Sequence, residues 1–147
     1  WVFARGELIE LLNSLNDNQL SFKPEGERWQ PLYYQFACCL RTQLVFIRAL
    51  NEGMMDFSWY GGQDLPSKHG LSNKLKLMEQ IDHNKREMVL SLRDSPGSIS
   101  WPDGERTVSS HISALIAHER MHIGQIMSYF ELAGFELPKS FKENWSL

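Results

Sequence analysis

Two histidines four residues apart, His118 and His122, are the part of the sequence best suited to chemistry. The surrounding residues have the composition of a helix, and a spacing of four places two side chains on one helical face, one turn apart. Two neutral imidazoles presented in this way can bind one metal ion from a single rigid element. A metal-binding pair is therefore the first hypothesis. The alternative is one buried or half-buried histidine and one solvated histidine without a ligand, because the spacing also arises by chance.

The neighbouring residues favour a pair that faces the protein interior. The same helical face carries three further residues of a core-facing stripe: Leu115, Ile126 and Tyr129. Gly124 lowers helix propensity in the same turn, which is sensible where a ligand or another backbone comes close. Gln125 lies seven residues after the first histidine, on nearly the same face, and can hold a ligating imidazole through a hydrogen bond. We therefore expect the pair to line the interior or the mouth of a helical assembly.

The other three histidines are not expected to join this pair. His111 lies two turns before His118, about 10 Å along the helix axis, which is too far to share one ion. We interpret it as a structural or surface residue. His83 lies among charged and amide residues and is expected on the solvated surface, and His69 lies in a predicted loop.

Two other metal motifs match the same residues, and both are disfavoured. The run from His118 to His122 fits the His-Glu-x-x-His pattern of zinc metalloproteases, in which the glutamate is the general base. The chain is short, however, and has neither an obvious sheet nor a clear third ligand downstream. Glu119 and His122 also fit the Glu-x-x-His run of di-iron bundles, which use that run twice, and the sequence has no second copy. We expect Glu119 to project sideways and to pair with a basic group or a loop.

Four segments with helical periodicity must position these residues: 2–15, 31–51, 72–93 and 107–133. The connection 54–69 reads as an ordered loop, and 99–104 reads as a turn or a short hairpin. This pattern predicts an all-α fold, an antiparallel four-helix bundle that forms a single domain over 1–147. The long connection would also permit a crossover between non-adjacent helices.

The apolar residues predict how these helices are buried. Segment 31–51 is apolar on most sides and is expected to be central. Segment 72–93 has an apolar stripe, which comprises Leu75, Leu77, Met78, Ile81, Met88, Val89 and Leu92. The tail aromatics Phe135, Phe141 and Trp145 are expected to cap one end of the bundle, with an interface as the alternative.

Composition argues against several partners. The chain of 147 residues has a formal net charge of −3 and no basic cluster, so we expect no nucleic-acid partner. No apolar run approaches the ~18–20 residues of a membrane helix, and the first residues do not resemble a signal peptide. Cys38 and Cys39 are adjacent and cannot form an ordinary disulfide, so a reducing cytoplasm is the expected location.

The sequence resembles the DinB/YfiT-like superfamily over most of its length. The resemblance is carried by the run His118–Gln125, by Tyr129, Ala133–Gly134 and Leu137–Pro138, by Phe22–Trp29, and by Trp101–Gly104 leading into Thr107. It implies a four-helix bundle wound up-down-down-up, often as a homodimer. It also implies a divalent metal ion held by three histidines, one from the second long helix and two from the fourth. Characterised members include S-transferases that use low-molecular-weight thiols.

The sequence departs from this family at one ligand, because segment 31–51 contains no histidine. Matching the run that begins at Arg41 places Cys38 where the family histidine is expected, and Cys39 or Gln35 fits with a small shift. A thiolate from Cys38 would complete a Cys-His-His site for zinc, nickel or iron. Alternatively the site has degenerated, holds no metal, and leaves Cys38 as a small core residue.

Two functions of different classes follow. The first is a metal-dependent transferase or hydrolase acting on a thiol or another small molecule, with Gln125 or Tyr129 orienting the substrate. The second is a non-catalytic dimeric bundle in which the histidines form hydrogen bonds in the core. The missing histidine of segment 31–51 favours the second function, and the family resemblance favours the first.

Overall fold

The computed structural model of the protein describes residues 2–145, with side chains over 5–143. The chain is mostly helical, as predicted. Four long helices dominate it: α1 (Val2–Asn13), α3 (Tyr33–Glu52), α4 (Lys74–Arg93) and α5 (Val108–Ala133). Within the described residues, no helix combines the length and apolarity needed to cross a membrane.

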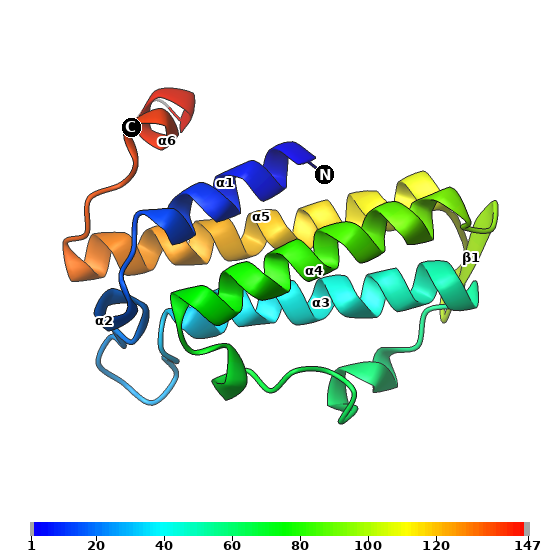
Figure 1. The fold of residues 1–147 in the computed structure, drawn as a ribbon, viewed down its shortest axis with the longest axis horizontal. Helices are drawn as coiled ribbons and strands as arrows, with labels where there is room; N and C mark the ends of the chain where they lie inside the picture. Colours follow the sequence, from blue (N-terminus) through cyan, green and yellow to red (C-terminus); the bar gives the residue numbers. More distant parts are fainter. Residues whose placement is uncertain (1, 146–147) are drawn as a thin grey trace.

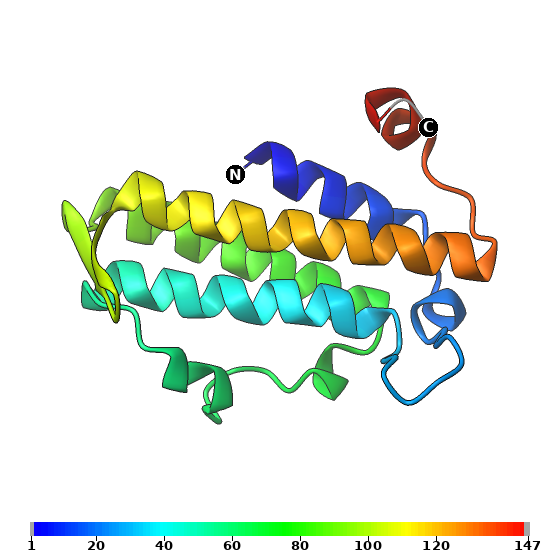
Figure 2. The ribbon, with the colours of Figure 1, turned by 180° about the vertical axis from the view of Figure 1, so that it is seen from behind.

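The long helices lie side by side (Figures 1 and 2). Helix α3 packs against both α4 and α5, and α1 packs against α5, so α3 has the central position expected from its apolar composition. The connection from α3 to α4 runs back along the outside of the helices, and α3 and α4 therefore begin at the same end (Figure 1). This connection contains two short 3₁₀ helices, η1 (Phe57–Gly61) and η2 (His69–Leu71).

Local capping explains where the long helices begin and end. The side chains of Asn73 and Thr107 accept hydrogen bonds from backbone amides three residues later, at 3.0 and 3.2 Å, and so start α4 and α5. Gly53 and Gly134 follow the last turns of α3 and α5 with φ of 70° and 67°, in the left-handed region that glycine adopts most easily. The predicted boundaries agree with the structure to within two residues.

The short elements are less visible in the sequence. Strands β1 (Ser98–Trp101) and β2 (Gly104–Thr107) form an antiparallel hairpin, which confirms the hairpin alternative for this stretch. Its β1 strand also bonds to the chain just after α3, through the Met55 amide and the Ser100 carbonyl at 2.7 Å. Helices α2 (Asp17–Leu20) and α6 (Lys139–Trp145) were missed, because segments this short carry little periodicity.

The predicted apolar stripe of α4 is partly wrong. Leu75 and Val89 are 68% and 61% exposed, and Leu92 is exposed as well. The buried face of α4 instead follows spacings of four and three residues, and comprises Leu77, Ile81, Asn84, Met88 and Ser91. Two of these side chains, Asn84 and Ser91, are polar. A sequence pattern cannot distinguish this face from its apolar neighbour, because burial of Asn84 requires partners on another helix.

The tail covers one end of the core, as expected. Phe141 is fully buried in the larger core cluster. Phe135 makes edge-to-face contacts with Phe22 and Phe130, with ring centroids 5.6 and 5.9 Å apart. These two aromatics therefore act as a cap, while the side chain of Trp145 lies outside the described residues.

Candidate metal centre

Three potential metal ligands meet between α3 and α5. One ligand atom from each of Cys38, His118 and His122 lies within 4.8 Å of the other two. The two imidazole centroids are 4.6 Å apart, as expected for side chains one helical turn apart on the same face. Tetrahedral sulfur and nitrogen ligands of one ion are roughly 3.5 Å apart, so small side-chain rotations would bring these atoms to coordinating distance.

His122 has the protonation state that a ligand requires. Its Nδ1 lies 2.8 Å from Oε1 of Gln35, and because an amide oxygen only accepts, Nδ1 carries the proton and Nε2 keeps its lone pair. Burial lowers the pKa of His122 to about 4, helped by the positive charges of His118 and Lys68, whereas a hydrogen bond with Gln125 acts in the opposite direction. The imidazole is therefore neutral near pH 7.

The two ring nitrogens of His118 have different surroundings. Its Nε2 lies 3.4 Å from the Thr42 hydroxyl, a long hydrogen bond. Its Nδ1 is buried, and none of the described residues offers that atom a hydrogen bond. Burial also lowers the pKa of His118, so the ring is held in its neutral form. Buried polar atoms without partners are rare because they are unfavourable, so this nitrogen is a position at which a ligand or an ion would be stabilising.

The structure separates the three candidates for the remaining ligand. Cys38 is half-buried and joins the two histidines. Cys39 is fully buried in the core, and burial raises the pKa of its thiol well above the ordinary value. Neighbouring residues in a helix point about 100° apart, so both cysteines cannot face the histidines. Gln35 contacts His122 from the same side of α3, as a hydrogen-bond partner. Both cysteines are free thiols.

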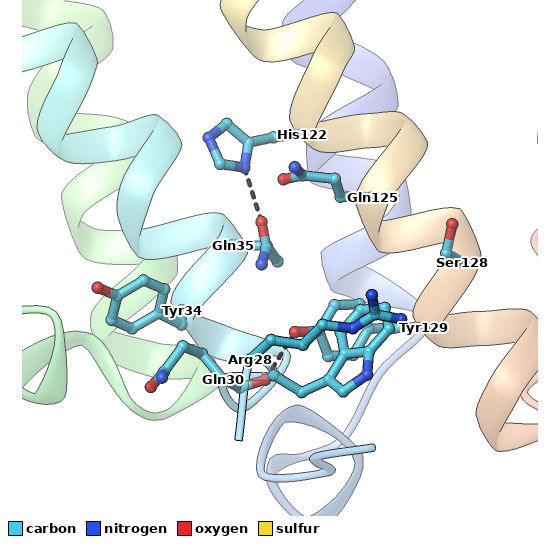
Figure 3. Close-up of a pocket in the computed structure, with 9 residues that line it drawn as sticks. Arg28, Gln30, Tyr34, Gln35, His122, Gln125, Ser128 and Tyr129 are labelled. Carbon is cyan, nitrogen blue, oxygen red and sulfur yellow. Dashed lines mark hydrogen bonds between the residues drawn. The ribbon is translucent and has the colours of Figure 1, made fainter. Parts of the chain in front are cut away.

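A cavity of about 580 Å³ opens beside His122 (Figure 3). Gln35 and Gln125 point toward the imidazole from α3 and α5, so Gln125 lies where a supporting amide was expected. The Tyr129 hydroxyl also lines this cavity, but it donates a 2.6 Å hydrogen bond to the Gln30 carbonyl oxygen. In the structure, Tyr129 therefore fastens the chain before α3 to α5.

Glu119 lies away from this cavity. It is fully buried, and its Oε1 accepts a 2.5 Å hydrogen bond from Nε2 of Gln43. Its charge also attracts the buried guanidinium of Arg5, and this attraction opposes the desolvation that lowers the pKa of Arg5. Glu119 thus interacts with a basic group, as expected. A metalloprotease base would have to face the bound water, so this position agrees with the interpretation against a protease.

The remaining histidines have other surroundings. His111 is fully buried under the hairpin, where Nδ1 accepts from the Trp101 indole at 3.2 Å and Nε2 donates to the Phe46 carbonyl at 3.0 Å. It is therefore structural, one of the two predicted alternatives. His83 is exposed, as predicted. His69 lies 3.0 Å from the Tyr33 hydroxyl.

Gly124 does not mark a close approach within the chain. A Cβ atom added to it would meet nothing within 4 Å, so the expected close approach of another backbone is wrong for this structure.

Sequence reasoning missed Thr42 and Lys68, both near the histidines. Thr42 lies four residues after Cys38 on the same face of α3, a spacing that could have indicated it. Lys68 comes from a connection without periodicity and gave no signal.

Comparison with known proteins identifies the family. A family model described as the DinB superfamily matches residues 1–126, a stretch that contains all three candidate ligands. No curated protein matches the chain. The match covers far more than half of the sequence and agrees with the resemblance carried by the histidine run and its neighbours. The chain therefore belongs to the DinB superfamily.

Proposed function

We propose that this protein is a metal-dependent enzyme in which Cys38, His118 and His122 hold one divalent ion. The observation that carries the proposal is the convergence of these three ligands between α3 and α5. A buried Nδ1 of His118 that none of the described residues satisfies supports it. The reaction class that fits best is transfer to or from a small thiol, or hydrolysis of a small molecule. The thiol is suggested by the resemblance to characterised family members.

The ligand set fits zinc, iron or nickel, because thiolate and imidazole are ligands that these ions accept. Three protein ligands leave one position open, as in catalytic rather than structural sites. A bound ion would act as a Lewis acid and lower the pKa of a water or thiol in the open position.

The protein's own residues would hold and orient the reactants. Gln35 fixes the tautomer of His122 through the Nδ1 hydrogen bond, and the lone pair of Nε2 would then be free to coordinate an ion. Gln125 presents an amide to the cavity beside His122 and can donate to or accept from a substrate there. Tyr129 keeps one wall of that cavity in place through its bond to Gln30.

We further propose that the four long helices form the up-down-down-up bundle of this family, as one domain over 1–147. The support is the return of the connection between α3 and α4 along the outside of the helices. A homodimer and a cytoplasmic location complete the proposal. The homodimer rests on the family resemblance, and the location rests on the two free thiols.

A non-catalytic protein with a degenerate site is the second candidate. It is favoured by the cysteine at the position of the family histidine and by Gln35, which already satisfies one nitrogen of His122. In this case Cys38 would be a half-buried thiol without a ligand role.

Metal content tests the two candidates. The wild type, Cys38→Ala and the matched control Cys39→Ala are loaded with zinc, nickel or iron(II), dialysed and analysed for metal. We expect one ion per chain in the wild type and in Cys39→Ala, and background levels in Cys38→Ala. Cobalt(II) loading adds a second readout, because a thiolate ligand gives a charge-transfer band that Cys38→Ser should lack. A wild type that stays metal-free after loading with excess ion refutes the enzyme proposal.

A further inference from the structure

A second cavity, of about 420 Å³, adjoins Cys38. One wall comes from α3, where Tyr34, Cys38 and Thr42 are spaced four residues apart on one face and Arg41 follows Cys38 by three. The facing wall comes from the connection between α3 and α4, and includes Lys68. The volume lies within the range of sites for small molecules. This cavity gives a second approach to the candidate metal centre.

The walls of this cavity are cationic. Arg41 and Lys68 line it, and among the residues whose side chains are described no aspartate or glutamate does. Neither cation forms one of the ion pairs found among the described residues. Two positive charges on one small cavity, without a carboxylate to balance them, attract an anion.

Neutral partners hold both cations in place. Arg41 donates one N–H to the Tyr60 carbonyl at 2.9 Å, and a guanidinium has four further donors. The Lys68 ammonium donates to the Tyr34 hydroxyl at 2.8 Å and lies 4.0 Å from the centre of that ring. These contacts fix the side chains without neutralising them. Arginine in particular suits carboxylate and phosphate, which it can bind with two parallel hydrogen bonds.

The cavity beside His122 has a different character. Its charged residue is Arg28, whose guanidinium lies over the Trp29 ring, 5.2 Å from its centre. The other lining side chains are amides, aromatics, one serine and His122 itself. The charge of Lys68 also contributes to the lowered pKa of His122, so its field reaches the candidate metal centre. An anion bound near Lys68 would therefore lie close to the reacting position.

We propose that the cavity formed by Arg41, Lys68 and the face of α3 around Cys38 binds the anionic group, a carboxylate or a phosphate, of the enzyme's small-molecule substrate. The hydroxyls of Thr42 and Ser67, which also line the cavity, can add neutral hydrogen bonds to the same group. The inference rests on the proposed function for what happens to the substrate, but the binding of the anion does not require the metal.

Alkylation of Cys38 in the metal-free protein tests this inference. Iodoacetate and iodoacetamide have similar size, and with each the cysteine sulfur bonds to the reagent's CH₂ group and releases iodide. Both rates depend on the same thiolate, so their ratio reports only the response to the reagent's charge. We expect the ratio of iodoacetate to iodoacetamide rates at Cys38 to be about tenfold higher than for N-acetylcysteine amide, a free thiol without a carboxylate. Fragment mass spectrometry distinguishes Cys38 from the buried Cys39.

Charge-removing variants locate the effect. In Arg41→Gln/Lys68→Gln the ratio should fall to that of the free thiol, whereas Arg28→Gln, which removes one charge from the other cavity, should leave it unchanged. Circular dichroism checks the fold, and Lys68→Gln alone, expected to lower the ratio several-fold, serves if the double variant does not fold. A double or single variant with the wild-type ratio, or an equal fall in Arg28→Gln, overturns the inference.

Protection experiments identify the anion. Inorganic phosphate and succinate are each tested for slowing the reaction of Cys38 with iodoacetamide. Protection by phosphate indicates a phosphate group, protection by succinate indicates a carboxylate, and protection by neither overturns the inference. Because the alkylation experiments use metal-free protein, a failure of the anion site can be distinguished from a failure of the proposed function. Failed metal loading refutes the proposed function alone, and a free-thiol alkylation ratio in a metal-binding protein refutes the anion site alone.

Discussion

At the scale of single residues, hydrogen bonds decide which atoms of the histidine pair can act. Gln35 accepts from Nδ1 of His122, which assigns the lone pair of that ring to Nε2. His118 has the opposite arrangement, because its Nε2 approaches the Thr42 hydroxyl and its buried Nδ1 has no partner among the described residues. Two residues of the same type, one turn apart, therefore present different nitrogens to their surroundings.

Replacement of Gln35 by Met should weaken metal binding without removing a ligand. The variant keeps a side chain of similar length but loses the acceptor that orients His122. Loss of such an outer hydrogen bond typically reduces metal affinity about 10–100-fold. Competition with a chelator measures the dissociation constant, and Gln63→Met, at an exposed position in the α3–α4 connection, is the control. An unchanged affinity in Gln35→Met would show that the hydrogen bond does not support a ligand.

His111 should make stability depend on pH. Burial lowers its pKa below the ordinary 6.5 and the charge of Arg106 acts in the same direction, whereas the hydrogen bond to the Phe46 carbonyl acts in the opposite one. The Trp101 indole donates to Nδ1, which can accept only while the ring is neutral. As the pH falls below about 6.5 the unfolded chain gains the proton first, so stability is complete above that pH and decreases below it.

Urea unfolding of the metal-free protein between about pH 7.5 and pH 5 measures this effect. These values lie above and below the ordinary histidine pKa of about 6.5. His111→Gln should lose about 1–3 kcal/mol at pH 7.5, because buried polar groups lose their partner, and its stability should fall less steeply with acid. His83→Gln, at an exposed position, should keep the wild-type profile. Parallel profiles for His111→Gln and the wild type would contradict the prediction.

At the scale of elements, α5 carries most of the candidate site on one rigid helix. It supplies both histidines and Gln125, while α3 supplies Cys38 and Gln35. Its length of 26 residues places the site near the middle, away from fraying ends. Gly124 is the weak point of this helix, since glycine gains no packing there and loses more backbone entropy than alanine on folding.

Gly124→Ala should stabilise the isolated chain by about 0.5–1 kcal/mol, because the added methyl meets no atom and the unfolded chain loses freedom. The opposite change at a nearby exposed site of α5, Ala117→Gly, should destabilise by a similar amount. Urea unfolding compares both with the wild type. A destabilised Gly124→Ala would contradict this prediction and would indicate that a partner copy or ligand packs against that face.

At the scale of the whole molecule, one polar side chain connects all four long helices. Gln43 of α3 is fully buried, and its Oε1 accepts from Nδ2 of Asn84 on α4, at 2.8 Å, and from Arg5 on α1. Its Nε2 donates to Glu119 on α5. A second link, the ion pair between Arg120 and Glu7, also joins α5 to α1. These directional contacts help to fix the relative rotation of the helices, because apolar core contacts are less directional.

Gln43→Leu should therefore destabilise the protein by about 3 kcal/mol or more, since buried charged and amide groups lose a shared partner. Gln80→Leu is the matched control, because Gln80 bonds to Asn84 at the half-buried edge of the same network. We expect it to cost less than about 1 kcal/mol. Equal effects in urea unfolding would show that the network contributes no more at its centre than at its edge.

The sequence alone determined the long helices and the family, and it limited the stretch before the last long helix to a turn or a hairpin. These features depend on local rules, namely helical periodicity, capping residues such as Asn73 and Thr107, and a motif in one continuous run. It also placed His118 and His122 on one face, because both lie on the same helix and its geometry is fixed.

The family resemblance favoured Cys38 but left Cys39 open, and only the tertiary structure brought Cys38 to the histidines. That choice depends on the rotation of α3 against α5, since neighbouring residues differ by about 100°. It also decided that Asn84 is buried while Leu75 is exposed, and that Lys68 joins Arg41 beside the site. Each of these outcomes needs a partner far away in the chain, and a local pattern contains no information about which distant residues will meet it.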